Sequence, residues 1–266
     1  SLAVRAGSGI SLDTAVSDLA FSNTAGNVDI ANAGALTIAS VDGLSGSSNT
    51  GGTTALSAAS PMTFTADVSS AGDLTATAGE TGSVDTDTIT VDAGVSVQST
   101  GGNVTLQAGD DVIVGSGATV SANGTLNLTA GYNDTDSDGG ISLDSSAALA
   151  GDPINLTAYD DITFGSGNQS GNEVNLNSSV GTIWMNDGGT YVFKNLSATG
   201  NTALGGTYRS GGAQTFNGPA LLVADTVLTS TDGGNITFNS TLDGSPVLTV
   251  NTIGTTAFNG TIGLST

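Results

Sequence analysis

The residues best placed to do chemistry are three aspartates at alternate positions in one acidic segment. Residues 133–140 have the sequence Asn-Asp-Thr-Asp-Ser-Asp-Gly-Gly, which contains Asp134, Asp136 and Asp138. The pattern Asp-x-Asp-x-Asp-Gly opens calcium loops, in which alternating carboxylates wrap a cation that prefers oxygen ligands. The glutamate that closes such loops is missing, because position 145 is serine with Asp144 beside it. The pattern predicts either a weak calcium site at the three aspartates or a solvated acidic bulge.

Two adjacent aspartate pairs, Asp110-Asp111 and Asp160-Asp161, are the other candidates for chemistry. Polysaccharide-cleaving enzymes use clustered carboxylates, and lyases add a lysine or arginine that takes a proton or stabilises an oxyanion. Neighbours on a strand point to opposite faces, so a pair adjacent in sequence is not a catalytic pair. The chain has one lysine and neither histidine nor cysteine. We therefore expect no enzyme, with a polysaccharide-active enzyme as a distant alternative.

The two aspartate pairs occupy equivalent places in near-copies of one segment. Residues 104–117 have the sequence Val-Thr-Leu-Gln-Ala-Gly-Asp-Asp-Val-Ile-Val-Gly-Ser-Gly, and residues 154–167 have Ile-Asn-Leu-Thr-Ala-Tyr-Asp-Asp-Ile-Thr-Phe-Gly-Ser-Gly. A third version, Leu-Asn-Leu-Thr-Ala-Gly, occupies residues 126–131. Self-similarity at this spacing indicates a repeat architecture. We interpret the aspartate pairs as corners that each repeat must turn.

Short segments that alternate apolar and polar residues predict β-strands along the whole chain, as in Leu36-Thr37-Ile38. Similar strands recur about every 24 residues, and one set of starting residues is Leu36, Leu56, Leu74, Val104, Leu126, Ile154, Val174, Leu196, Leu222 and Leu248. A unit of this length with two or three strands fits one coil of a parallel β-helix. We predict an all-β fold, a parallel β-helix (β-solenoid) of about ten coils, as a single domain over residues 1–266.

Alternation also predicts which side chains face the core of each coil. In the clearest coil these are Ile154, Leu156, Ala158, Ile162 and Phe164. Tandem β-sandwiches and a propeller are the competing folds, but they predict similarity at roughly 100 and about 40 residues. The observed similarity at 20–30 residues favours coils.

Residues 178–210 interrupt the regular pattern with the only tryptophan, Trp184, together with Tyr191, Phe193 and Tyr208. Three interpretations remain open. The segment is a bulkier part of the core or a loop packed on the side of the rod, an aromatic platform for a sugar, or a boundary between two sub-segments.

Charge narrows the range of partners. The chain has 24 acidic and 3 basic residues, a formal net charge of −21. Nucleic-acid binding requires clustered lysine or arginine, so we expect no nucleic-acid partner. No run of 18 apolar residues occurs, so we expect no membrane insertion. The chain starts without methionine, which indicates a processed product or a piece of a longer protein.

The last 70 residues carry a family resemblance. Residues 212–217, 222–230, 234–244 and 248–260, and more loosely 100–176, resemble the repeats of filamentous-haemagglutinin-like and autotransporter-type bacterial surface proteins. The resemblance implies a right-handed parallel β-helix, export to the cell surface, and roles in adhesion, biofilm or filament formation. One departure is the lack of an Asn-x-Asn-Gly element of the kind found in the secretion domain of many such proteins.

The expected function is an extracellular structural or adhesive rod, as the stalk or repeat segment of a bacterial surface adhesin. The alternative is a self-assembling head-to-tail filament or surface-layer subunit, because the open edges of a β-helix favour end-to-end association. The expected partners are neighbouring repeats or identical subunits, with surface glycans or other cells as further candidates. Calcium is the one cofactor that the sequence suggests.

Overall fold

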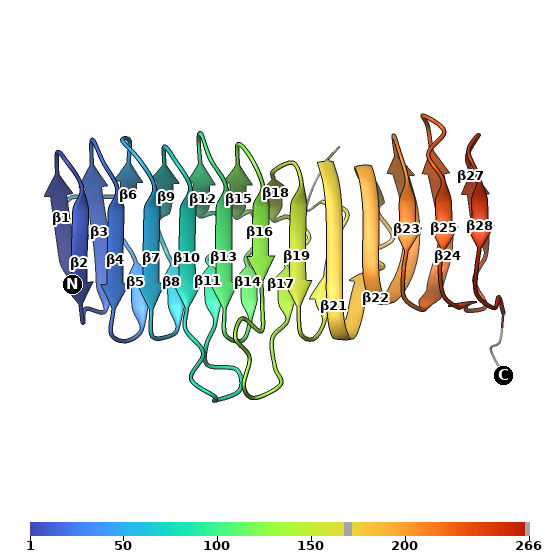
Figure 1. Cartoon of the computed structure of the whole chain (residues 1–266), viewed down its shortest axis with the longest axis horizontal. Coiled ribbons are helices and arrows are strands. Elements are labelled where there is room, and N and C mark those ends of the chain that lie inside the picture. Colours follow the sequence, from blue (N-terminus) through green and yellow to red (C-terminus); the bar gives the residue numbers. More distant parts are fainter. Residues whose placement is uncertain (168–171, 264–266) are drawn as a thin grey trace.

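The computed structural model describes residues 1–167 and 172–263, and within them the chain is all β. The strands form a parallel β-solenoid of about 11 turns, which confirms the predicted all-β class and repeat architecture. Figure 1 shows an elongated body with the two termini at opposite ends. The described residues contain no helix that is long and apolar enough to cross a membrane. The right-handed winding stays a prediction.

The strands stack into three parallel ladders, which we call the first, second and third faces. The first face consists of β2 (Ile10–Thr14), β4 (Val28–Asn32), β7 (Thr54–Ala58), β10 (Leu74–Ala78), β13 (Val104–Ala108), β16 (Leu126–Thr129), β19 (Ile154–Ala158), residues 174–178 of β21 (Asn172–Met185), residues 195–199 of β22 (Thr190–Ser210), β23 (Gln214–Phe216), β25 (Ile236–Phe238) and β28 (Thr256–Phe258).

Within each coil, the strand of the second face comes after the strand of the first face and is joined to it by a corner. It consists of residues 18–19 of β3 (Asp18–Asn23), β5 (Leu36–Ile38), β8 (Met62–Phe64), β11 (Ile89–Val91), β14 (Val112–Val114), β17 (Ile141–Leu143), β20 (Ile162–Thr163), residues 182–185 of β21, residues 201–204 of β22, residues 220–222 of β24 (Ala220–Ser230) and β26 (Leu242–Asp243).

The third face completes the coil. It consists of β1 (Leu2–Ala6), residues 19–23 of β3, β6 (Gly46–Asn49), β9 (Asp67–Ser70), β12 (Ser96–Ser99), β15 (Thr119–Ala122), β18 (Ala148–Ala150), residues 206–210 of β22, residues 226–230 of β24 and β27 (Leu248–Asn251).

The core fills the space between the three faces, and alternation along each strand decides which side chains enter it. All five predicted inward residues of the 154–164 coil are at most 1% exposed, which confirms that prediction. Asn155 and Thr157 on the same strand are partly exposed. The buried apolar residues form one cluster that runs from Ile10 to Leu242.

The predicted row of repeat starts is correct in its middle and wrong at its ends. Leu74, Val104, Leu126, Ile154, Val174 and Leu196 are direct partners along the first face. Leu36 and Leu222 lie on the second face and Leu248 on the third. Leu56 lies two positions beyond the row, because Thr54 is the partner of Leu74. All three faces use the same apolar-polar-apolar pattern, so the pattern does not say to which face a strand belongs.

Short polar side chains connect successive coils at the corners. Asp73 Oδ1 accepts a hydrogen bond from the backbone N–H of Asn103 at 2.7 Å, and Asn103 Oδ1 accepts one from Thr125 at 2.9 Å. Asp111 and Asp161 accept in the same way from Gly140 and Thr182. The interpretation of the aspartate pairs as corners is therefore confirmed for Asp111 and Asp161. A short carboxylate reaches nearby backbone amides, which explains why aspartate exceeds glutamate here.

The irregular segment 178–210 belongs to the coil stack. Strands β21 and β22 pair with the coils on both sides, with register shifts between Asn177 and Thr182 and between Leu204 and Gly206. Tyr191 and Tyr208 are fully buried, and their rings stack 4.7 Å apart. Phe193 is 2% exposed, so these three aromatic side chains are core residues.

Two long connectors between the first and second faces stand out from the rod. Residues 79–88 join β10 to β11, and residues 130–140 join β16 to β17, whereas only residues 109–111 make the same corner in the coil between them. Both connectors project from the same side of the molecule (Figure 1). Their position places acidic residues of three successive coils at one corner.

Alternation makes a direct prediction on β13. Leu106→Ala removes a fully buried side chain and should lower the free energy of unfolding by about 2–5 kcal/mol. Gln107→Ala, on the outward side of the same strand, should change it by no more than about 0.5 kcal/mol. Denaturant midpoints measured by circular dichroism test both. Equal shifts for the two variants would contradict the assigned facing of β13.

Candidate functional site

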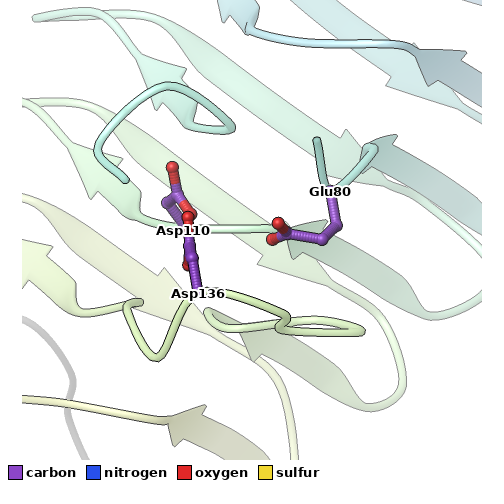
Figure 2. Close-up of side chains that lie close together, drawn as sticks. All are labelled: Glu80, Asp110 and Asp136. Carbon is purple, nitrogen blue, oxygen red and sulfur yellow. The ribbon is translucent and has the colours of Figure 1, made fainter. Parts of the chain in front are cut away.

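Three carboxylates from three successive coils meet at the corner where the long connectors project. Glu80 belongs to connector 79–88, Asp136 to connector 130–140, and Asp110 to the short corner between them. One carboxylate oxygen of each lies within 4.8 Å of the corresponding oxygens of the other two. Figure 2 shows the three side chains pointing toward one another. We call Glu80, Asp110 and Asp136 the carboxylate cluster.

Asp110 is the fixed centre of the cluster. Its side chain is fully buried, and its Oδ2 accepts hydrogen bonds from the backbone N–H of Thr86 at 2.6 Å and of Asp87 at 2.8 Å. Its other oxygen, Oδ1, is buried and has no hydrogen-bond partner among the described residues. The donations to Oδ2 hold the Asp110 carboxylate in place beside those of Glu80 and Asp136.

Glu80 connects the two long connectors. Its Oε1 accepts hydrogen bonds from the N–H of Gly82 and from the hydroxyl of Thr135, the latter at 2.9 Å. Its Oε2 is buried and finds no partner in residues 1–167 and 172–263. Close approach here requires glycine at position 109, because a Cβ there would lie 2.8 Å from the Cα of Glu80.

Asp136 carries the strongest electrostatic penalty of the cluster. Both of its carboxylate oxygens are buried and lack a hydrogen-bond donor within the described part of the chain. Burial, and after it the charges of Asp110, Glu80 and Asp134, together raise the pKa of Asp136 to about 6.

The other two aspartates of the sequence motif have local roles. Asp134 Oδ1 accepts hydrogen bonds from the N–H groups of Asp136 at 3.0 Å and Ser137 at 2.7 Å. Burial opposes the ionisation of Asp134, but these donations outweigh it and lower the pKa of this carboxyl group. Asp138 Oδ2 accepts from the N–H of Asp85 at 3.0 Å and so joins the two connectors.

The structure thus brings one predicted ligand, Asp136, into a set that the sequence pattern did not predict. Glu80 and Asp110 are distant in sequence and become neighbours only through the stacking of coils. The near-copied aspartate pair is a sequence signal for Asp110, although by itself the pair indicates a turn. Glu80 is one of only two glutamates in the chain, and nothing in its local sequence indicates a site.

No basic side chain of the described residues balances the cluster. Arg5 pairs with Asp42 and Lys194 with Asp152, at N–O distances of 3.6 and 3.1 Å. Arg209, the third basic residue of the chain, lies in β22, several coils away. The negative charge of the cluster is therefore left to solvent ions or to a proton.

A shallow groove on the second face is a separate candidate for binding. Trp184 lies in one outward row with Ala203, Leu221 and Asp243, and these residues line a groove of about 330 Å³. The indole N–H of Trp184 donates a hydrogen bond to Asp161 Oδ2 at 2.9 Å, which orients the ring. Of the aromatic residues in segment 178–210, Trp184 is the one that the described structure leaves partly exposed on the outside.

Comparisons of the chain with protein-family models, with curated proteins and with solved structures found no match. The resemblance to filamentous-haemagglutinin-like and autotransporter-type proteins therefore stays a prediction.

The pKa of Asp136 gives a prediction for metal-free protein. The folded state raises this pKa from its ordinary value of 3.8 to about 6, so ionisation of Asp136 lowers the stability of the folded connectors as the pH rises between these two values. In the presence of a chelator, wild-type connectors 79–88 and 130–140 should lose hydrogen-exchange protection between about pH 4 and pH 6.5 and show little further loss above that. Asp136→Asn should lose much less. Protection factors corrected for intrinsic exchange measure this, with Asp29→Asn as a control that should behave like wild type. An identical pH dependence for Asp136→Asn would contradict the prediction.

Proposed function

We propose that this chain is a structural and adhesive rod segment of an extracellular bacterial surface protein. Repeat folds of this kind are elongated and present long, continuous surfaces on which partners can bind. The observation that supports the proposal most is the continuous apolar core, which extends through the coil stack from Ile10 to Leu242. The sequence resemblance to surface β-helix repeats supports the same assignment. The lack of enzymatic activity remains a prediction from the sequence.

The last described coil leaves several apolar side chains partly exposed. Phe216, Phe238 and Phe258 stack in succession, with ring centroids 4.7 and 5.4 Å apart. Phe258 is still 38% exposed, and Leu248 and Val250 are only partly buried. A further coil stacked on β27 and β28 would bury these side chains and pair the outer strand edges. That coil comes from the same polypeptide in a stalk, and from a second copy in a head-to-tail filament.

The end-to-end contact can be tested with matched substitutions. We expect the purified 266-residue chain to associate with increasing concentration, and Phe258→Asp to reduce this association because it places a charge in the stacking surface. Ile113→Asp makes a similar change at a similarly exposed position (37%) in the middle of the rod and should leave association unchanged. Sedimentation velocity and electron microscopy measure the distribution of lengths. Monodisperse monomers at every concentration would rule out the filament and leave the stalk.

We further propose that the groove at Trp184 contacts saccharides of a partner surface. An amphipathic ring beside polar Thr and Asn side chains suits a sugar, because the ring covers an apolar sugar face while hydroxyls and amides bond to its edges. Thr182 and Asn201 supply such groups in the groove.

Trp184 is the only tryptophan of the chain, so tryptophan fluorescence reports directly on binding in the groove. Titration with a panel of oligosaccharides should shift the fluorescence of Trp184 for at least one class of sugar. A glycan array should then show that Trp184→Ala loses the same binding, while Tyr132→Ala, which does not line the groove, keeps it. Unchanged fluorescence and equal array signals for both variants would exclude the groove as a glycan site.

A further inference from the structure

We propose that Glu80, Asp110 and Asp136 bind one calcium ion, which joins connectors 79–88 and 130–140 across the coil between them. This inference is independent of the proposed role as a rod. It replaces the ligand set suggested by the alternating aspartates with one drawn from three successive coils, of which only Asp136 belongs to the motif.

The first argument is the state of the oxygens. Asp110 Oδ1, Glu80 Oε2 and both oxygens of Asp136 are buried, and no donor among the described residues reaches them. A buried charged oxygen without a partner is costly, and proteins satisfy such groups by pairing or by metal coordination. Asp110 is the decisive member because it is 0% exposed and is held by two backbone N–H groups. The fold thus holds this carboxylate, with one oxygen unpaired, beside the carboxylates of Glu80 and Asp136.

The second argument is that a proton alone does not resolve the arrangement. Four carboxylate oxygens of the cluster are buried without a donor among the described residues: Asp110 Oδ1, Glu80 Oε2 and both oxygens of Asp136. One proton forms one hydrogen bond and so leaves at least two of these oxygens unpaired. A divalent cation contacts all three carboxylates at once and offsets their mutual repulsion.

The third argument concerns the kind of cation. The ligands are all oxygens, and the chain contains no histidine or cysteine, which selects hard cations over zinc or copper. Calcium takes 6–8 oxygens at about 2.3–2.6 Å, so a single ion spans oxygens up to roughly 5 Å apart. The cluster's oxygens lie within 4.8 Å of one another, a separation compatible with one shared calcium ion. Magnesium requires near-ideal octahedral geometry at about 2.0–2.1 Å, which side chains from three separate corners fit less readily.

The consequence of binding is local. Within the described residues, two hydrogen bonds to side chains link the connectors, one from the Thr135 hydroxyl to Glu80 and one from the Asp85 N–H to Asp138. An ion bound by all three carboxylates adds a strong link between the coil of β10 and the coil of β16, which are separated by the coil of β13. Calcium should therefore order the projecting corner while leaving the strands of the rod unchanged.

Calorimetric titration of metal-free protein with calcium chloride tests the binding itself. We expect one site above the weak background that a chain of net charge −21 gives. Asp136→Asn should weaken that site by roughly tenfold or more, since even outer-shell substitutions cost 10–100-fold. Asp29→Asn removes the same charge from an exposed position on β4 and should bind like wild type. Magnesium chloride should give a weaker site. Identical isotherms for wild type and Asp136→Asn would overturn the proposal.

Limited proteolysis tests whether calcium orders connector 79–88, which contains Glu80. A glutamate-specific endoproteinase has two target bonds in this chain, after Glu80 and after Glu173. Calcium should slow cleavage after Glu80 and leave cleavage after Glu173 unchanged, which makes Glu173 an internal reference for the activity of the protease. In Asp136→Asn, calcium should no longer protect Glu80. Cleavage after Glu80 that is insensitive to calcium in the wild-type protein would also overturn the proposal.

Discussion

Parallel backbone pairing between successive coils is the constraint on which the rest of this structure depends. Each strand exchanges hydrogen bonds with the coil before it and the coil after it, so the register of one coil fixes the next. A residue therefore stacks on its counterpart at a spacing of roughly 4.8 Å. Leu128 lies between Leu106 and Leu156 for this reason, and the phenylalanines of β23, β25 and β28 form one stack.

The same stacking explains the polar side chains on the outside. Asn127, Asn155 and Asn175 are partners along the first face, and the side-chain amides of Asn155 and Asn175 each donate a hydrogen bond to Oδ1 of the preceding asparagine at 2.9 Å. At the corners, aspartate and asparagine accept hydrogen bonds from the backbone of the neighbouring coil. Such ladders satisfy polar groups that a flat parallel stack would otherwise leave unpaired. They also account for a surface rich in Asn, Thr and Asp and poor in lysine.

Corners are where this fold tolerates variation, and the carboxylate cluster results from that freedom. Strand lengths and registers are fixed by pairing, whereas a corner can be lengthened without disturbing the ladders. Connectors 79–88 and 130–140 are two such extensions, one on each side of the short corner that contains Asp110. Acidic residues in separate turns do not repel one another, but they become close neighbours when their coils stack. The electrostatic repulsion between their carboxylates therefore arises only when the three coils are assembled.

The sequence by itself determined the class of the fold, the inward and outward side chains and the corners, because alternation and turn chemistry are local properties. The similar segments 104–117, 126–131 and 154–167 indicated a repeat, and the pairing of Val104, Leu126 and Ile154 confirms that they lie in successive coils. Only the tertiary structure decided to which face Leu36, Leu222 and Leu248 belong, since connectors of unequal length remove any fixed spacing between faces. It alone brought Glu80 and Asp110 to Asp136, because contacts between coils depend on stacking register, which local sequence patterns do not encode.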